Sequence, residues 1–290
     1  MGASAKRIFE EAILINNLPQ LVNVQWLNQH LKDTNIVVLF SSMKDPFTGQ
    51  IDVAPAGYIP GSRFFDFEEV ICDLTTGLPH SMPSAELFST EVQKLGVNKD
   101  SHIIVYDAKG IYSSARVWWM FKSMGHENVS VLNGGLPAWQ QLGYSLEKSF
   151  SQVEKSGDFA SNLQLNRLIS AEQLLASLAD VQVIDARSAG RFYAVAPEPR
   201  AGLRAGHIPS AINLPFIDCI RDGLLLSTED LHQLIFKLAV DADKKLIFSC
   251  GSGVTACILA LAFQQAGYQN MAVYDGSWSE WGSRDDLPIA

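Results

Sequence analysis

The stretch that decides the fold is Lys245-Leu-Ile-Phe-Ser-Cys-Gly-Ser-Gly-Val-Thr-Ala-Cys-Ile-Leu-Ala260. The run Leu246-Ile-Phe248 is continuously apolar, which is typical of a strand buried on both faces of a parallel sheet. A glycine-rich turn follows, and the next apolar run predicts a helix over 253–266. A strand that leads through a tight turn into a helix indicates an α/β domain.

The same order of elements occurs twice in the chain. The first half predicts helix 22–32, strand 36–40, helix 84–95, strand 102–106, helix 113–124 and strand 129–132. The second half predicts helix 170–178, strand 181–185, helix 228–238, strand 245–249, helix 253–266 and strand 271–274. We expect two small parallel sheets flanked by helices, in domains 1–146 and 167–290. A polar linker over 147–166 would join them. The alternative is one doubly wound domain.

The composition narrows the class of protein. Of 290 residues, 47% are hydrophobic and 18% charged, which provides ample material for a core. A formal net charge of −9 argues against nonspecific nucleic-acid binding, which depends on neutralising phosphates. Any anionic substrate therefore needs a local cluster of cations.

The N-terminus and the cysteines bear on the compartment. The short apolar patch Ala12–Ile15 follows two glutamates and does not resemble a signal peptide, and no apolar run is long enough for a membrane span. The four cysteines form no C-x-x-C pair, so a zinc ribbon is not expected. We expect a reducing, cytoplasmic setting without metal or membrane partners, with a mitochondrial address left open.

Cys250 stands apart from the other cysteines because it ends a strand and opens the glycine-rich turn. Ligands of open α/β sheets bind outside the carboxyl ends of strands. Amide groups of the turn and of the following helix can point at the sulfur and favour a negative charge there. The alternative is an inert cysteine at a strand end, which is the interpretation we give Cys257 within the apolar run that follows. A cysteine phosphatase would need arginine at position 256, which is alanine.

The heptapeptide Cys250-Gly-Ser-Gly-Val-Thr-Ala256 resembles the active-site loop of rhodanese-family sulfurtransferases, in the form found in 3-mercaptopyruvate sulfurtransferases. Further matches are Ile184-Asp-Ala-Arg187, Gly206-His-Ile-Pro209, Asp107-Ala-Lys-Gly110 and Tyr274-Asp-Gly-Ser-Trp-Ser-Glu-Trp281. The resemblance covers about residues 20–288 and implies two tandem rhodanese domains. Only the second would be catalytic, because Asp107 stands where the second half has Cys250.

The resemblance also implies the site residues. Arg191 and Arg200 would hold the substrate carboxylate, and Ser252, His80 and Asp66 would relay a proton beside Cys250. The loop residues Gly251, Gly253, Val254 and Thr255 would contact the substrate. Arg187 is expected to pair with a carboxylate such as Asp185, His207 to brace its loop, and Arg204 to be a solvated surface charge.

The implied reaction is sulfur transfer from 3-mercaptopyruvate through a Cys250 persulfide, with release of pyruvate and no cofactor. The acceptor would be a thiol such as thioredoxin, or cyanide. Gly251 and Ser252 replace two cations that thiosulfate-specific relatives carry in this loop, which favours mercaptopyruvate over thiosulfate. A thiosulfate:cyanide sulfurtransferase and a persulfide carrier acting with a protein partner are the alternatives.

Overall fold

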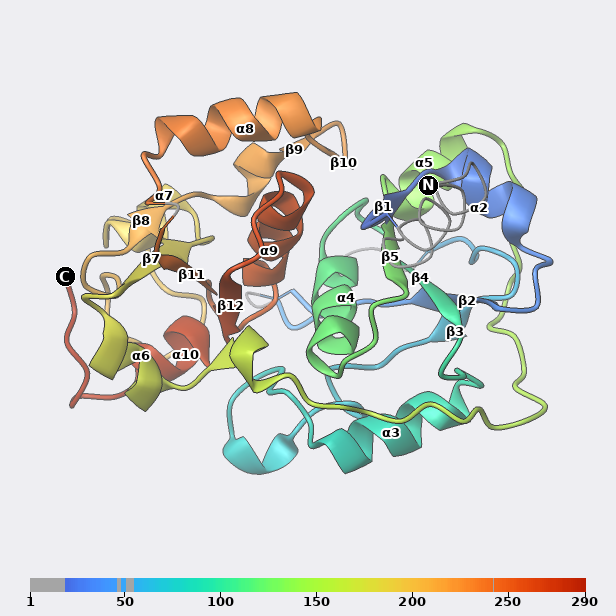
Figure 1. The fold of residues 1–290 in the computed structure, drawn as a ribbon, viewed down its shortest axis with the longest axis horizontal. Helices are drawn as coiled ribbons and strands as arrows, with labels where there is room; N and C mark the ends of the chain where they lie inside the picture. Colours follow the sequence, from blue (N-terminus) through green and yellow to red (C-terminus); the bar gives the residue numbers. More distant parts are fainter. Residues whose placement is uncertain (1–18, 46–47, 51–54, 242) are drawn as a thin grey trace, which may run out of the picture.

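The computed structural model describes residues 19–45, 48–50, 55–241 and 243–290. The described chain forms two similar halves, each built around a five-stranded sheet (Figure 1). The apolar patch Ala12–Ile15, on which part of the compartment prediction rests, lies outside the described residues. Among the residues that are described, no helix is both long and apolar enough to cross a membrane.

Both sheets have parallel strands in the same spatial order. The first is ordered β1-β5-β4-β2-β3, and the second β6-β12-β11-β7-β8. The strands of the first sheet are β1 (Leu21–Val22), β2 (Ile36–Phe40), β3 (Arg63–Phe64), β4 (His102–Tyr106) and β5 (Val129–Leu132). Those of the second are β6 (Leu168–Ile169), β7 (Val181–Asp185), β8 (Ile212–Asn213), β11 (Lys245–Ser249) and β12 (Met271–Tyr274). The predicted α/β duplication is thus confirmed.

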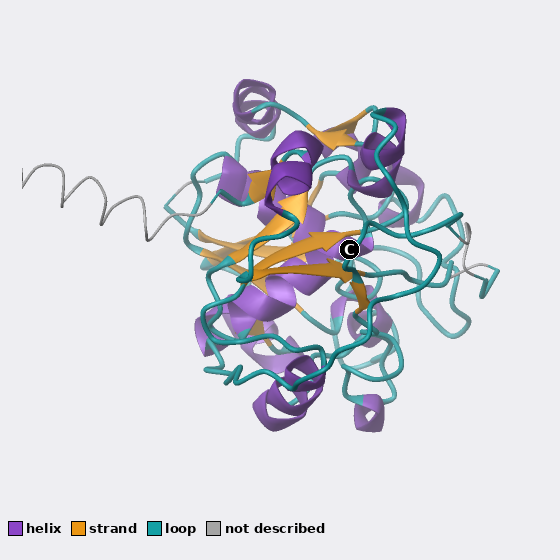
Figure 2. Cartoon of the chain, turned by 90° about the vertical axis from the view of Figure 1, so that its right-hand side faces the viewer, coloured by secondary structure: helices purple, strands orange, loops and turns teal. Residues whose placement is uncertain are grey.

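Helices cover the sheets on both faces, and in the view of Figure 2 the strands lie between helices above and below. The first half contains α2 (Val24–His30), α3 (Ala85–Lys94), α4 (Ser113–Ser123) and α5 (Gly135–Gln141), with the 3₁₀ turn η1 (Leu74–Thr76). The second contains α6 (Ala171–Ser177), α7 (Ala189–Phe192), α8 (Thr228–Lys237), α9 (Ala256–Gln265) and α10 (Ser277–Trp281). It also contains the turns η2 (Leu165–Arg167) and η3 (Phe216–Cys219), and the antiparallel hairpin of β9 (Ile220–Arg221) and β10 (Leu224–Leu225).

The six longer strands lie where the sequence predicts them, whereas two helices begin later than predicted. Helix 22–32 is replaced at its start by β1, and the side chain of Asn23 then caps α2 by accepting from the Trp26 amide. The helix expected from 253 begins at Ala256, because Gly253 has φ of +76° and turns the chain around the cysteine first.

The two halves meet along α4 and α9, which lie side by side in the centre of Figure 1. Every residue of α4 is buried, and α9 is buried from Ala256 to Phe263. One apolar cluster contains side chains of both helices and of both sheets, so a single core runs through the interface. The carboxyl ends of β4 and β11 therefore lie at this junction.

Candidate active site

Cys250 follows the last residue of β11 at the junction of the two halves. Only 1% of its surface is exposed, and it borders a cavity of about 250 Å³. The cavity is lined from the second half mainly by the loop that starts at Cys250 and by Arg191 and Arg200, and from the first half by Met43, Asp45 and Tyr112. Cys250, three arginines (Arg187, Arg191 and Arg200) and a wall from the other half thus share one small space, and the sequence predicts Cys250, Arg191 and Arg200 there.

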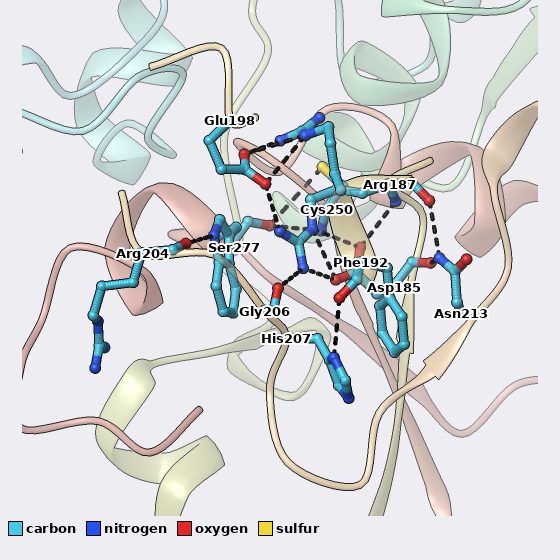
Figure 3. A network of polar contacts seen from close by, with 12 residues as sticks. Asp185, Arg187, Phe192, Glu198, Arg204, Gly206, His207, Asn213, Cys250 and Ser277 are labelled. Carbon is cyan, nitrogen blue, oxygen red and sulfur yellow. Dashed lines mark hydrogen bonds and ion pairs between the residues drawn. The ribbon is translucent and has the colours of Figure 1, made fainter. Parts of the chain in front are cut away.

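The conformation of the loop after Cys250 is stabilised by hydrogen bonds to a serine that the sequence analysis did not single out. Ser277 Oγ accepts hydrogen bonds from the amides of Cys250 and Gly253, each at 3.1 Å, and donates to the Tyr274 carbonyl at 2.9 Å. It lies 4.0 Å from the Cys250 sulfur (Figure 3). Two amides of the loop therefore face Ser277 instead of the sulfur, which corrects part of the expectation.

Other amides of the loop have no hydrogen-bond partner among the described residues. Those of Gly251, Ser252, Val254 and Thr255 have no hydrogen-bond acceptor within the described part of the chain. Buried amides are nearly always satisfied, so amides left open along a cavity are available to a group that binds there. Gly251, Ser252, Val254 and Thr255 line the cavity, whereas Gly253 does not.

The predicted pair of Ser252 and His80 is present. His80 Nδ1 lies 3.0 Å from Ser252 Oγ, and His80 Nε2 lies 3.2 Å from Glu68 Oε1. Because an ionised carboxylate only accepts, Nε2 carries the proton and Nδ1 of the neutral ring accepts from the serine hydroxyl. His80 has φ of +61°, so the backbone is strained to present this ring.

The acid behind His80 is Glu68, and the assignment of Asp66 to that position is wrong. Asp66 Oδ1 accepts from the amides of Glu68 and Glu69 at 3.1 and 2.9 Å. Its carboxylate therefore stabilises a turn of the chain, and this turn places the side chain of Glu68, two residues later, beside the ring. The segment Asp66-Phe-Glu68 contains both acids, and only the turn geometry distinguishes them.

The two arginines that the sequence predicts to bind the substrate border the cavity with different partners. Arg191 is held by Glu198, with Nη2–Oε2 at 2.6 Å and Nε–Oε2 at 3.1 Å. A side chain at Gly251 would place its Cβ 3.0 Å from Arg191 Nη2, so the arginine covers the loop closely at this glycine. Arg200 lies among fewer fixed partners, and burial lowers the pKa of its guanidinium.

Arg187 has the structural role that the sequence predicts. It is fully buried and pairs with Asp185 at 2.7 Å and Glu198 at 2.8 Å (Figure 3). Its guanidinium also stacks 4.2 Å from the Trp278 ring centre. Glu198 thus joins Arg187 to Arg191, a link that sequence reasoning missed. His207 braces the loop as expected, since its ring stacks 3.9 Å from Phe192 and Nδ1 bonds the Phe192 carbonyl at 3.0 Å.

Arg204 is not the solvated surface charge that we expected. Its guanidinium is half-buried and donates to main-chain carbonyls at and after the end of α10, namely those of Trp281, Gly282, Arg284 and Leu287. It therefore satisfies carbonyls that the helix leaves unpaired, and its positive charge stabilises the negative end of the helix dipole. Sequence alone offers no signal for this contact, because donor and acceptors are some 77–83 residues apart.

The equivalent loop of the first half contains an anion of its own. Asp107 Oδ1 accepts from the Lys109 amide at 2.8 Å, and Oδ2 accepts from the amides of Tyr112 and Ser114 at 2.7 and 3.0 Å. The Ser114 hydroxyl donates to the same oxygen at 2.6 Å. Asp107 thus fills its loop, as suits the predicted non-catalytic half.

The remaining cysteines do not fit a catalytic role. Burial raises the pKa of Cys257 and of Cys219 to about 12, and also raises that of Cys72. Cys257 is fully buried in the core, as expected from its apolar run. In the described parts of the chain, no group of three or more His, Cys, Asp or Glu side chains could hold a metal ion.

Comparison with known proteins agrees with this geometry. The rhodanese-like domain model matches residues 23–142 and 170–284. A 3-mercaptopyruvate sulfurtransferase of Escherichia coli is 42% identical over 273 residues, with 92% of this chain and 96% of that protein covered. A thiosulfate sulfurtransferase of Mus musculus is 38% identical, covering 91% of this chain and 92% of that protein.

The fold is also shared with a solved structure. The crystal structure of SseA from Escherichia coli, described as a 3-mercaptopyruvate sulfotransferase, has a TM-score of 0.80. It is 38% identical in sequence, and the match covers 90% of this chain and 99% of that one. The chain therefore belongs to the rhodanese family, as a tandem of two rhodanese-like domains.

Proposed function

We propose that this protein is a 3-mercaptopyruvate sulfurtransferase that carries sulfur as a Cys250 persulfide. The observation that supports it most is the combination around one thiol of four open amides and two bordering arginines, Arg191 and Arg200. The relatives that are named for this activity span nearly the whole chain. We place the division into domains 1–146 and 167–290 at the linker 147–166.

The first half-reaction follows from the positions of these groups. The Cys250 thiolate attacks the sulfur of the donor, the donor's carbon–sulfur bond breaks, and its electron pair remains on carbon as the pyruvate enolate. The enolate takes up one proton and leaves as pyruvate, and the donor's own thiol supplies that proton overall. The open amides of the loop stabilise the persulfide that stays on the enzyme.

Proton movement is the role that we assign to Ser252 and His80. The serine hydroxyl lies in the cavity wall. His80 Nδ1 can first take up the proton of the donor thiol, and it then returns this proton through the Ser252 hydroxyl, which donates its own proton to the enolate. Glu68 holds the ring through Nε2 and stabilises its cationic form. The relay is thus Ser252–His80–Glu68.

Donor orientation is the role of the two arginines. Arg191 and Arg200 both line the cavity beside the loop, and a guanidinium can hold a carboxylate through two parallel hydrogen bonds. Glu198 fixes the fork of Arg191 from behind, so less rotational entropy is lost on binding. We assign the donor carboxylate and carbonyl to this pair.

The loop favours mercaptopyruvate over thiosulfate. Gly251 and Ser252 contribute no cations for a small dianion, and a Cβ at Gly251 would lie 3.0 Å from Arg191 Nη2, so that the guanidinium would have to shift. The named relatives include enzymes of both kinds, so the preference between the two sulfur donors rests on these loop residues. For the second half-reaction we propose a thiol acceptor such as reduced thioredoxin, with cyanide as a substitute, in the cytoplasm.

The test is release of pyruvate from 3-mercaptopyruvate, followed with a coupled dehydrogenase, with Cys250→Ser as the control. We expect turnover in the wild type, none in the control, and kcat/KM for thiosulfate at least about tenfold lower. Comparable use of thiosulfate would assign the protein to the other donor. Persulfide formation on Cys250 without turnover by small thiols would favour a carrier that acts with a protein partner.

A further inference from the structure

Arg116 of α4 is a fully buried arginine of the non-catalytic half that reaches the catalytic loop. Its Nη2 donates to the His80 carbonyl at 2.6 Å and lies 2.7 Å from Asp275 Oδ1. Its Nη1 donates to the Gly253 carbonyl at 3.4 Å. One guanidinium therefore contacts two separate stretches of main chain and one carboxylate at the junction of the halves.

The two stretches are those that carry the proton relay. His80 is contacted at its own carbonyl, and Ser252 through the carbonyl of the next residue, Gly253. The relay partners are 172 positions apart in sequence and belong to different halves, so no local structure fixes the distance between them. His80 has φ of +61°, and a strained non-glycine backbone keeps such a conformation only when its surroundings hold it.

The junction beside the Asp107 loop has a neutral residue at the position equivalent to Asp275. Asn133 and Asp275 each begin the turn after the last long strand of their half, and each binds an amide of the opposite half. Asn133 Oδ1 accepts from Leu225 at 3.0 Å, and Asp275 Oδ2 accepts from Met82 at 2.8 Å. A neutral side chain is thus sufficient for that contact.

The position equivalent to Arg116 is equally informative. Arg116 lies nine residues after Asp107, and the residue nine after Cys250 is Leu259, which is buried in the shared apolar core. At the junction beside the Asp107 loop, the equivalent positions are therefore uncharged, Leu259 from the second half and Asn133 from the first, where the catalytic junction has Arg116 and Asp275. A buried ion pair is expensive to desolvate and is often replaceable by apolar groups without loss of stability.

We propose that Arg116, held by Asp275, is a positioning residue that sets the hydrogen bond between His80 and Ser252. This inference rests on the proposed function, because it concerns the protonation of the departing enolate. The rigid fork of arginine suits a contact with several fixed acceptors. Misplacement of a catalytic group by about 1 Å can lower a rate by roughly a hundredfold, so a remote residue that fixes this distance has a measurable effect.

The test is the double variant Arg116→Leu/Asp275→Asn. It gives this junction the two uncharged residue types that stand at the equivalent positions beside the Asp107 loop. The single-turnover rate of pyruvate release is measured in the wild-type background and again in His80→Ala. We expect the variant to fold, with a melting temperature within a few degrees of the wild type. Its rate should fall about tenfold in the wild-type background and less than about twofold in His80→Ala, because residues that act through one another are not additive.

Lys122→Met is the matched control. Lys122 is another buried cation of α4, with 3% of its side chain exposed, but it binds Glu127 within the first half. Its loss should leave the rate of pyruvate release unchanged.

Three results would overturn the inference: an unchanged rate, the same loss in both backgrounds, or failure of the double variant to fold. The last would show that the ion pair holds the architecture itself. The failure of the proposed function is seen separately, as a wild type that releases no pyruvate, and it would remove both proposals.

Discussion

The loops that begin at Asp107 and at Cys250 have the same framework and different contents. Each follows the central strand of its sheet, and the next helix begins at Ser113 or Ala256 at the same spacing. In the first loop, the amides of Lys109 and Tyr112 donate to the Asp107 carboxylate. Their counterparts, Ser252 and Thr255, have no acceptor in the described chain. The fold thus makes the same loop twice, and a carboxylate fills the first one, which supports the proposal that the second stabilises an anion.

The two loops also differ in the space that the neighbouring segments leave beside them. Gly110 of the first loop lies directly against Gly223 of the β9–β10 hairpin, where a Cβ would be 2.5 Å from the Gly223 carbonyl oxygen. Beside the second loop, Met43, Asp45 and Tyr112 of the first half leave a cavity of about 250 Å³. An anion site becomes a reaction site only where a nucleophile replaces the carboxylate and space remains for a substrate.

Moving the thiol should produce the largest effect. In Cys250→Ser/Asp107→Cys the cysteine occupies the closed loop, which lacks both arginines and the histidine. We expect sulfur transfer to fall at least about a thousandfold and to equal that of Cys250→Ser alone. Recovery of pyruvate release by the double variant would show that the loops are functionally interchangeable and would break the comparison.

The relay should produce the next largest effect. His80→Ala removes the group that moves a proton, so kcat with mercaptopyruvate should fall roughly a hundredfold. Asp66→Asn is the matched control, since Asp66 only accepts from the amides of Glu68 and Glu69. Its kcat should stay within about twofold of the wild type, whereas Glu68→Gln should lower kcat about tenfold. A larger loss in Asp66→Asn than in Glu68→Gln would restore the original assignment.

Emptying the first loop should affect stability and not chemistry. Asp107→Ala leaves buried amides unsatisfied, and we expect a loss of about 3 kcal/mol in the free energy of unfolding. Urea denaturation measures this loss, and kcat of the folded variant should be nearly unchanged. If the variant is as stable as the wild type, the Asp107 carboxylate is not the internal anion that we describe.

The smallest effect concerns His102, which begins the central strand of the first sheet at the position that Lys245 takes in the second. Burial lowers the pKa of His102 to about 4, and its ring bonds Ser130 Oγ at 2.9 Å. The unfolded chain, with a His pKa near 6.5, then binds more protons than the folded chain between about pH 6.5 and pH 4. Stability should therefore be complete above pH 6.5 and fall with acidification, by about 2 kcal/mol at pH 4.5. A His102→Gln variant that keeps the full acid sensitivity of the wild type would contradict this assignment.

The long elements were predictable from sequence because they repeat one pattern. The six apolar strands carry enough residues to show that they are buried, and the order of elements recurs in both halves. The edge strands β1, β3, β6 and β8 have two residues each, so no periodicity is available to reveal them. They form because a neighbouring strand offers its edge, which is a tertiary effect.

The same distinction explains which site residues were found. Cys250, Ser252 and the two arginines lie in continuous motifs, so they could be located from sequence. Glu68 was missed in favour of Asp66 because both acids lie in one turn, and only the fold shows which carboxylate reaches His80. Ser277 was missed because its position in the loop depends on a φ of +49°, which sequence gave no reason to expect for serine.

The most direct test of the account is the structure of the protein after exposure to 3-mercaptopyruvate. We predict a second sulfur on Cys250 within hydrogen-bonding distance of the amides of Ser252 and Thr255, in the position that the Asp107 carboxylate takes in its own loop. A second sulfur directed away from these amides, or none on Cys250 while pyruvate is released, would contradict it.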